Sequence, residues 1–305
     1  MSLDSDMIID RRRLKRRLTF WRILGVLALV AAVVAAVGRF DLSSDKAHIA
    51  RLAIDGIIVD DQLREETLLK IADNPSIKAL IVSINSPGGT FTGGDNLYQT
   101  LREVADKKPV VAVMGGTAAS AGYMIAIAAD HVIANAGTIT GSIGVIMQTA
   151  DVTGLLEKIG VKPVIVKSGD LKAQPNPMEP FGEQARSVTQ AIIRDFYDLF
   201  VEIVIERRNL SPDVAYALAD GRIYSGRQAA ANGLVDAVGR ERDALKWLSE
   251  NRDISDQLPI HDVKIDYEDE PWRELVGKSL GKVLFSERLR LDGVLSLWHP
   301  EGHLD

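Results

Sequence analysis

One serine stands in a setting that suits nucleophilic chemistry. Residues 110–114 form an apolar run that predicts a buried strand, and two glycines end it. Small residues follow, and the mostly apolar residues 123–129 then predict a buried helix. Ser120 therefore lies near a helix N-terminus, where exposed N–H groups stabilise developing negative charge and small neighbours let a second chain come close. The stretch fits a nucleophile, and it also fits a serine that only caps a helix.

A nucleophilic serine needs a base, and a histidine partner is hard to find in this chain. The histidines are His48, His131, His261, His299 and His303. They do not show the spacing of a zinc ligand set. His131 follows the predicted Ser120 helix at its far end, roughly 15 Å along the helix axis. None of the five lies in an obvious glycine-rich catalytic loop.

A lysine is the alternative base. It accepts a proton only when neutral, so its pKa must fall from about 10.4 through burial or nearby positive charge. Holding that pKa near about 8 costs roughly 3 kcal/mol. Lys167 and Lys172 both belong to a polar, proline-containing loop over residues 167–177. Spacing alone leaves both lysines open as the base.

The order of the predicted elements indicates an α/β domain. Strands, loops and helices alternate about every 30 residues, a pattern typical of helices packed on a sheet. Predicted strands cover residues 48–59, 77–84, 110–114, 131–136, 161–166 and 234–238. Predicted helices cover residues 62–72, 93–104, 123–129, 153–159, 183–208, 227–231 and 241–250, with a further helix starting at 211.

Composition excludes several classes of function. The chain has no cysteine, so it holds neither disulfides nor thiolate metal sites. Residues 1–40 carry eight basic and three acidic residues, whereas the remaining residues carry 28 and 39. An acidic body argues against nucleic-acid binding. No metal or organic cofactor is implied by any motif.

The basic head of the chain precedes a long apolar segment. Residues 1–17 are predicted to be a basic cytoplasmic segment, 18–40 a transmembrane anchor and 41–47 a linker. A single domain over 48–250, to which the motifs below belong, and a partly ordered C-terminal extension over 251–305 then follow. The positive-inside rule places everything beyond the anchor across the membrane. A cleaved signal peptide is the alternative, because residues 35–38 are small.

Five motifs, in this order and spacing, resemble the signal peptide peptidase A family in its short, single-repeat form. They are Asn85-Ser86-Pro87-Gly88-Gly89, Gly116-Thr117-Ala118-Ala119-Ser120-Ala121-Gly122-Tyr123, Thr140-Gly141-Ser142-Ile143-Gly144-Val145, Lys167-Ser168-Gly169-Asp170-Leu171-Lys172, and Asp220-Gly221-Arg222 with Gly233-Leu234-Val235-Asp236. The resemblance covers roughly residues 48–250. It implies a ClpP/crotonase-like superhelix of strand–strand–helix repeats.

The resemblance also implies roles for individual residues. Ser120 would be the nucleophile and Lys172 the general base, with Ser142 orienting the lysine. The backbone N–H groups of Gly89 and Ala121 would form the oxyanion hole, where each donor is worth on the order of 3 kcal/mol. Two positions depart from the family pattern: Ala121 replaces a common glycine, and Ala173 follows Lys172 in place of a frequent aspartate.

The family's partners follow from the same resemblance. Its members are membrane-anchored endopeptidases that cleave remnant signal peptides and other apolar peptides on the extracytoplasmic, periplasmic side of the inner membrane. They form ring- or dome-like homo-oligomers whose sites combine the serine and lysine of neighbouring subunits. Three other readings stay open: a ClpP-type Ser-His-Asp protease, a crotonase-like acyl-CoA enzyme, and an inactive peptide-binding scaffold in which Ser120 is only a cap.

Overall fold

The computed structural model describes residues 20–30, 46–265, 267 and 295–297. The chain divides into two units, Met1–Lys46 and Ala47–Asp305. In the first unit, residues 20–30 are helical. Within the described part of the chain, no helix is both long enough and apolar enough to cross a membrane. Most of the predicted anchor, residues 18–19 and 31–40, lies outside the described residues, so the anchor stays a prediction.

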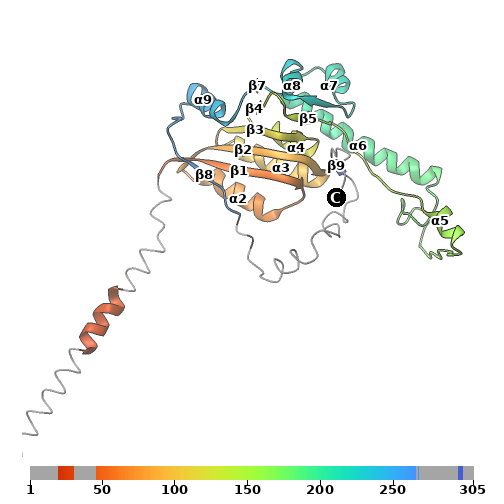
Figure 1. Cartoon of the computed structure of the whole chain (residues 1–305), viewed down its shortest axis with the longest axis horizontal. Coiled ribbons are helices and arrows are strands. Elements are labelled where there is room, and N and C mark those ends of the chain that lie inside the picture. Colours follow the sequence, from red (N-terminus) through yellow and green to blue (C-terminus); the bar gives the residue numbers. More distant parts are fainter. Residues whose placement is uncertain (1–19, 31–45, 266, 268–294, 298–305) are drawn as a thin grey trace, which may run out of the picture. The chain divides into compact units, whose positions relative to one another are not determined.

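A mixed sheet forms the centre of the second unit (Figure 1). Its strands are β1 (His48–Ile58), β2 (Ile77–Thr90), β3 (Val110–Ala119), β4 (His131–Ala134), β5 (Ile139–Gly141), β6 (Ile223–Ser225), β7 (Ala237–Val238), β8 (Ile260–Asp262) and β9 (Leu295–Leu297). The main order is β6-β5-β3-β2-β1-β8. The first half of β3 pairs with β4 and its second half with β5, all in parallel. The predicted α/β class is confirmed.

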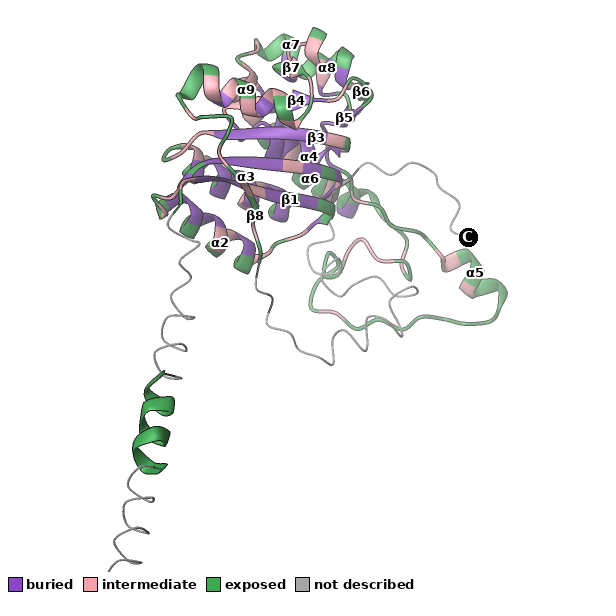
Figure 2. Ribbon diagram, turned by 60° about the vertical axis from the view of Figure 1, so that its left-hand side comes forward, coloured by how far each residue is buried: buried purple, intermediate pink, exposed green. Residues whose placement is uncertain are grey.

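The central strands are buried on both faces, which explains their nearly continuous apolar sequence. On one face, Leu80, Val82 and Ile84 of β2 join the larger core cluster. On the other face, Ile81 of β2 joins a smaller cluster that includes Leu248. Figure 2 colours the middle strands almost entirely as buried. The functional end of the sheet therefore rests on a rigid, close-packed centre.

Helices cover both faces of this sheet. They are α2 (Gln62–Asp73), α3 (Phe91–Ala105), α4 (Ala121–Ala126), α5 (Thr153–Lys158), α6 (Glu183–Arg208), α7 (Pro212–Leu218), α8 (Gly226–Ala231) and α9 (Glu241–Arg252). Side-chain caps fix several starts: Asp61 accepts from the N–H of Arg64, and Thr90 accepts from the N–H of Gly93. Ser225 and Gln228 form a capping box at α8. The helices predicted from sequence are all present.

Two predicted strands are longer than the sequence indicated. β2 continues through the glycine-rich residues 85–90, beyond the predicted end at 84, and β3 continues through Gly115 and Gly116 to Ala119. The added residues of β2 pair with β1, where Ile57 opposes Gly88 and Ile58 opposes Gly89. Glycine lets the two backbones come close enough for this pairing, so here it extends the sheet.

The predicted strand over residues 161–166 is wrong. These residues have no strand assignment, and Val164 and Val166 are 88 and 95% exposed. They belong to a segment over residues 146–182, which we call the arm. Figures 1 and 2 both show the arm, with α5, extending away from the sheet. An apolar run becomes a strand only beside a partner strand, and no strand among the described residues pairs with the arm.

Candidate active site

Ser120 lies at the junction between β3 and α4, in an unusual backbone conformation. Its φ is 56° and its ψ is −121°, and only 1% of the residue is exposed. Such geometry costs an L-residue about 1–3 kcal/mol and is typical of a nucleophile held on a sharp strand-to-helix turn. Ser120 occupies the N-cap position of α4, but its side chain makes no capping hydrogen bond. The structure thus disfavours the reading in which Ser120 is only a cap.

Hydrogen bonds from the neighbouring loop fix the end of β3. The Thr138 hydroxyl donates to the carbonyl of Gly115 at 2.6 Å, and the Thr140 hydroxyl donates to that of Ala118, also at 2.6 Å. The Asn135 amide donates to the carbonyl of Met114 at 2.9 Å. Sequence reasoning missed these three residues. The signal available was their polarity next to a strand end, where side chains often replace backbone partners.

Ser142 lies beside Ser120 because it follows β5, the strand that pairs with the end of β3. Ala119 pairs with Gly141, and the Ser120 N–H donates to the Gly141 carbonyl at 2.8 Å. Ser142 follows with a left-handed φ of 50°, and its N–H donates to the carbonyl of Arg222 at 2.8 Å. The residue is 9% exposed and lines a cavity of about 420 Å³. The structure therefore brings Ser120 and Ser142 together at the end of β3.

Gly89 lies on the other side of the nucleophile, in the extension of β2. Ser86 of β2 pairs with Ala118, two residues before Ser120. The Gly88 N–H donates to the Ser86 hydroxyl at 3.1 Å, which fixes the strand just before Gly89. A Cβ at Gly89 would lie 1.8 Å from the carbonyl oxygen of Ile58. Only glycine fits between β1 and the site.

Ala121, the second predicted oxyanion donor, is the first residue of α4 and is fully buried. The first N–H groups of a helix have no intrahelical partner, so this position suits an anion. Its methyl group faces Gly94 of α3, where an added Cβ would lie 2.9 Å from the Ala121 Cβ. Because Gly94 has no side chain, α3 leaves room for the methyl group of Ala121, the residue that departs from the family pattern.

The two candidate lysines both lie in the arm, apart from Ser120. The Lys167 ammonium donates to both oxygens of Glu179, at 2.8 and 3.0 Å. Hydrogen bonds from Lys167 and then Asn176 hold the pKa of Glu179 below its ordinary value. Lys172 is exposed, and its N–H donates to Gly169 within the arm. Within the single chain, the described residues bring Ser120, Ser142 and Gly89 together but leave Lys172 outside.

The described histidines lie at the opposite end of the sheet from Ser120. His131 pairs with Val111, nine residues before Ser120, which is about 30 Å along an extended strand. His48 and His261 lie at the same end, where their rings stack 4.4 Å apart beside the start of β1. This placement argues against a Ser-His-Asp triad built from them. His299 and His303 lie outside the described residues.

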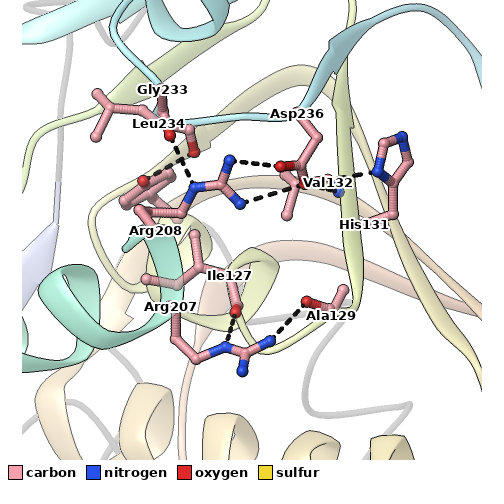
Figure 3. A network of polar contacts seen from close by, with 10 residues as sticks. Ile127, Ala129, His131, Val132, Arg207, Arg208, Gly233, Leu234 and Asp236 are labelled. Carbon is pink, nitrogen blue, oxygen red and sulfur yellow. Dashed lines mark hydrogen bonds and ion pairs between the residues drawn. The ribbon is translucent and has the colours of Figure 1, made fainter. Parts of the chain in front are cut away.

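His131 instead belongs to a partly buried ion network, shown in Figure 3. Its Nδ1 lies 3.7 Å from Asp236, which also accepts from Arg208 at 2.6 Å and from the N–H of Val132 at 2.7 Å. Burial alone would raise the pKa of Asp236, but Arg208 and the Val132 N–H outweigh it, so this pKa is lowered. Burial lowers the pKa of His131, whose ring stacks on Trp247.

Arginine side chains bind the backbone directly after the C-terminal end of α4. Arg207 donates to the carbonyls of Ile127 and Ala129, at 2.8 and 3.0 Å. Figure 3 shows its guanidinium between these two carbonyls. Arg102 donates to the carbonyl between them, that of Ala128, at 2.7 Å. Positive charge at a helix C-terminus satisfies the last carbonyls and complements the helix dipole. The helix that starts at the nucleophile is therefore anchored at its other end.

The described part of the chain shows no metal centre, because no three His, Cys, Asp or Glu side chains in it gather closely enough to hold a metal ion. The groups that the fold places beside Ser120 include the backbone N–H of Ala121 at the start of α4 and the hydroxyl-bearing Ser142. Such groups suit acyl transfer, in which a serine attacks a carbonyl and N–H donors bind the oxyanion.

Replacing Gly89 tests the close approach of β1 and β2. In Gly89→Ala, the new Cβ would collide with the backbone of Ile58, so β1 and β2 must separate. We expect a loss of at least about 2 kcal/mol in the free energy of unfolding, measured by urea denaturation. Gly137→Ala is the matched control, because nothing lies within 4 Å of its Cβ position. Equal stability of the two variants would contradict this account.

Acid should weaken the network around His131. The pKa of His131 is lowered in the folded state, so the unfolded state binds the proton more readily. The stabilising contribution of the neutral ring is present above the unfolded pKa of about 6.5 and is lost as pH falls below it. Between pH 7 and 5, wild type should lose more unfolding free energy than His131→Gln. Parallel losses in the two proteins would exclude this linkage.

Comparison with known proteins identifies the family that the five motifs resemble. The model of peptidase family S49 matches residues 102–255, a range that includes Ser120, Ser142 and Lys172. A candidate protease of Synechocystis sp. is 40% identical over 207 residues, which cover 67% of this chain and 74% of that protein. A candidate signal peptide peptidase SppA of Enterococcus faecium is 35% identical over 226 residues, covering 70% of this chain and 66% of that protein.

Among solved structures, a mutant of ClpP1 from Listeria monocytogenes aligns with 63% of this chain and 92% of its own, at 21% identity and a TM-score of 0.43. The family match covers half of the chain, and the Synechocystis relative is matched over most of its length. The family resemblance predicted from the five motifs is confirmed. With a serine on a strained strand-to-helix turn and glycine-rich strands on either side, the chain belongs to the serine peptidases of family S49.

Proposed function

We propose that the protein is an endopeptidase that uses a Ser120–Lys172 dyad. The observation that carries this proposal is the position of Ser120, which is strained, buried, and set between the strands that hold Gly89 and Ser142. A preorganised strand–turn–helix junction of this kind is what a serine nucleophile needs. Nothing in a purely structural role requires the strain at Ser120.

In the proposed reaction, the Ser120 Oγ attacks the peptide carbonyl carbon while neutral Lys172 takes the hydroxyl proton. The N–H groups of Gly89 and Ala121 bind the tetrahedral oxyanion. The lysine ammonium then donates its proton to the leaving amine, which departs as the C–N bond breaks. Water attacks the acyl-serine ester, with the lysine again as base, and releases the acid.

Three features support Lys172 rather than Lys167 as the base. Lys167 is held by Glu179, whose two carboxylate oxygens both accept hydrogen bonds from its ammonium group. Gln174 and Asn176 complete the hydrogen bonds to the same Glu179 carboxylate. These contacts fix the loop on either side of Lys172, whose side chain stays exposed. Lys167 therefore suits a positioning role in the arm.

We further propose that the arm of one subunit delivers Lys172 to Ser120 of a neighbour in a homo-oligomeric ring. Val164 and Val166 expose apolar surface that a second copy could cover. Ser142, which would orient the lysine, lines a cavity of about 420 Å³ with Val145, Tyr197 and Asp220. Contact between subunits would exclude water from the side chain of Lys172.

The proposed substrates are apolar peptides, including signal peptides left after protein export. The apolar N-terminal segment would anchor the protein in the inner membrane, with its catalytic unit on the periplasmic side. The sequence motifs and the family support this assignment. A scaffold without catalysis is the remaining alternative, and the activity of the wild type separates the two.

Arginine substitutions identify the base. Arginine keeps the positive charge of lysine but does not deprotonate in proteins, so it cannot serve as a base. We expect Lys172→Arg and Ser120→Ala to lose at least about 10³-fold in kcat/KM on a signal-peptide-derived fluorogenic peptide. Lys167→Arg, which can still pair with Glu179, should stay within about tenfold of wild type.

Lys162→Arg is the matched control, an exposed lysine in the same arm. A fluorophosphonate should label Ser120 in the wild type and not in Ser120→Ala. Loss of activity in Lys167→Arg with activity retained in Lys172→Arg would move the base to Lys167. An inactive, unlabelled wild type would favour the scaffold.

Mixed oligomers test whether the site is shared. Ser120→Ala and Lys172→Ala subunits should each be inactive alone. If serine and lysine come from neighbours, random equal mixing restores up to about a quarter of the sites, because one junction in four joins an intact serine to an intact lysine. Activity is measured after co-expression with two affinity tags and tandem purification. No recovery in a verified mixed oligomer would place both residues in one chain.

A further inference from the structure

The loop that carries Lys172 is organised around one carboxylate. Glu179 accepts two hydrogen bonds from the Lys167 ammonium, at 2.8 and 3.0 Å. It also accepts from the side-chain amides of Gln174 and Asn176, at 3.0 and 2.7 Å. The side chains of Lys167 and Glu179 are only 18 and 21% exposed, whereas Lys172 is exposed. Donors on both sides of Lys172 in the sequence therefore close the loop and leave the lysine at its outside.

The residue after Lys172 has a backbone conformation that alanine seldom adopts. Ala173 has a φ of 62°, in the left-handed region. Residues other than glycine, asparagine and aspartate are uncommon there, because the Cβ crowds the backbone. Strain of this kind persists only where surrounding contacts hold the residue. Ala173 therefore requires a contact that keeps it in place.

The few strained residues of this chain follow a pattern. In the described part of the chain, five residues other than glycine have a positive φ. Asn209 and Asp253 are the C-caps of α6 and α9, where a left-handed residue is common. The other three are Ser120, Ser142 and Ala173. Strain outside the helix ends thus occurs at the proposed nucleophile, at the serine proposed to orient the lysine, and directly after the proposed base.

Asn176 supplies the contact that Ala173 requires. Its Nδ2 donates to the carbonyl of Ala173 at 3.0 Å and to Glu179 at 2.7 Å, which uses both hydrogens of the amide group. Its Oδ1 accepts from the N–H of Met178 at 3.0 Å. The amide of Asn176 therefore ties the strained residue to the carboxylate at the centre of the loop.

The conformation of Ala173 sets the direction of the lysine. A change of φ at Ala173 turns the peptide plane that joins it to Lys172, and so moves the lysine relative to the closed part of the loop. A general base must come within about 3 Å of the proton that it takes. Misplacement by about 1 Å lowers a rate by about 10²-fold. A loop that is already ordered also loses less conformational entropy when a second subunit binds it.

We propose that Asn176, itself held by Glu179, is a positioning residue for Lys172, because it keeps Ala173 left-handed and so fixes the direction from which the lysine approaches Ser120. This inference rests on the proposed peptidase function and deepens it. A role in which Asn176 only orders the arm makes a different prediction, because it gives no special part to the backbone of Ala173.

Asn176→Asp removes only the donors. The carboxylate still accepts from the N–H of Met178, but it cannot donate to Ala173 or to Glu179, and it repels Glu179. On the signal-peptide-derived fluorogenic peptide, we expect kcat of the full-length variant to fall at least about tenfold, with KM within about twofold of wild type. A fall in kcat without a change in KM is what loss of positioning produces, because the substrate still binds.

Asn251→Asp is the matched control. The Asn251 amide donates to the carbonyl of Trp247 at 3.0 Å, so the same substitution removes a similar hydrogen bond on α9, outside the arm. This variant should keep the wild-type kcat. Equal kcat in wild type and Asn176→Asp, where wild type is active, would overturn the proposal.

Ala173→Gly tests whether Asn176 acts through the strained residue. Glycine adopts a positive φ about as readily as a negative one, so it needs less restraint at this position. We expect Ala173→Gly alone to stay within about threefold of the wild-type kcat. In that background, Asn176→Asp should lower kcat by no more than about threefold, because the two residues are coupled. The same tenfold loss in both backgrounds would reject an action through Ala173.

Hydrogen exchange gives a readout that needs no catalysis. The N–H of Lys172 donates to Gly169 at 3.0 Å, and the N–H of Gln174 donates to Leu171 at 3.2 Å. In full-length Ser120→Ala, mass spectrometry should show residues 168–179 exchanging at least about threefold faster once Asn176→Asp is added. Adding Ala173→Gly as well should reduce this difference.

The outcomes distinguish this inference from the proposed function. Faster exchange in Asn176→Asp that Ala173→Gly reduces, without peptidase activity in any protein, would keep the hold of Asn176 on the loop and reject the peptidase. Active peptidases with equal kcat and equal exchange in wild type and Asn176→Asp would reject the positioning role and keep the peptidase.

Discussion

The end of β3 must hold a serine in a conformation that L-residues rarely adopt, and much of the surrounding structure serves this constraint. The strain at Ser120 costs about 1–3 kcal/mol. It is offset locally by the hydrogen bond from the Ser120 N–H to Gly141 and by the hydroxyls of Thr138 and Thr140, each worth about 1 kcal/mol. β5 is short, yet it supplies most of these partners. Without β5, the chain would relax at Ser120.

A second constraint on Ser120 is that α4, the helix that follows it, must be held at its C-terminal end. A helix of six residues has little stability of its own, so both of its ends must be fixed by tertiary contacts. The guanidinium groups of Arg102 and Arg207 bind the carbonyls of residues 127–129, directly after the helix, and the hydroxyl of Tyr123 donates to the carbonyl of Leu234 at 2.9 Å. The partly buried carboxylate of Asp236 accepts from Arg208 and from the Val132 N–H. The charges far from Ser120 therefore help to set its position.

A local pattern led to Ser120, whereas the other proposed site residues came from the family motifs. Ser120 was singled out because small residues and glycines at a strand end are a local signal. Ser142 and Gly89 were assigned through the resemblance of the motifs that contain them. The continuation of β2 through Pro87 was missed, since proline and glycine usually indicate a turn and the close approach of β1 is not visible in the sequence. The run 161–166 was predicted as a strand from its apolar residues alone. Strand pairing depends on a partner elsewhere, and local pattern carries no information about that partner.

The proposed enzyme has a rigid part, whose position is set by folding alone, and a part whose position depends on a second subunit. The proposed nucleophile follows β3 directly, and the proposed oxyanion donors lie on β2 and at the start of α4, so their positions are set once the chain folds. The proposed base lies in an exposed arm, apart from these elements. Placing the base on a separate segment makes the proposed activity depend on a further event, contact between subunits, while the strained centre stays fixed.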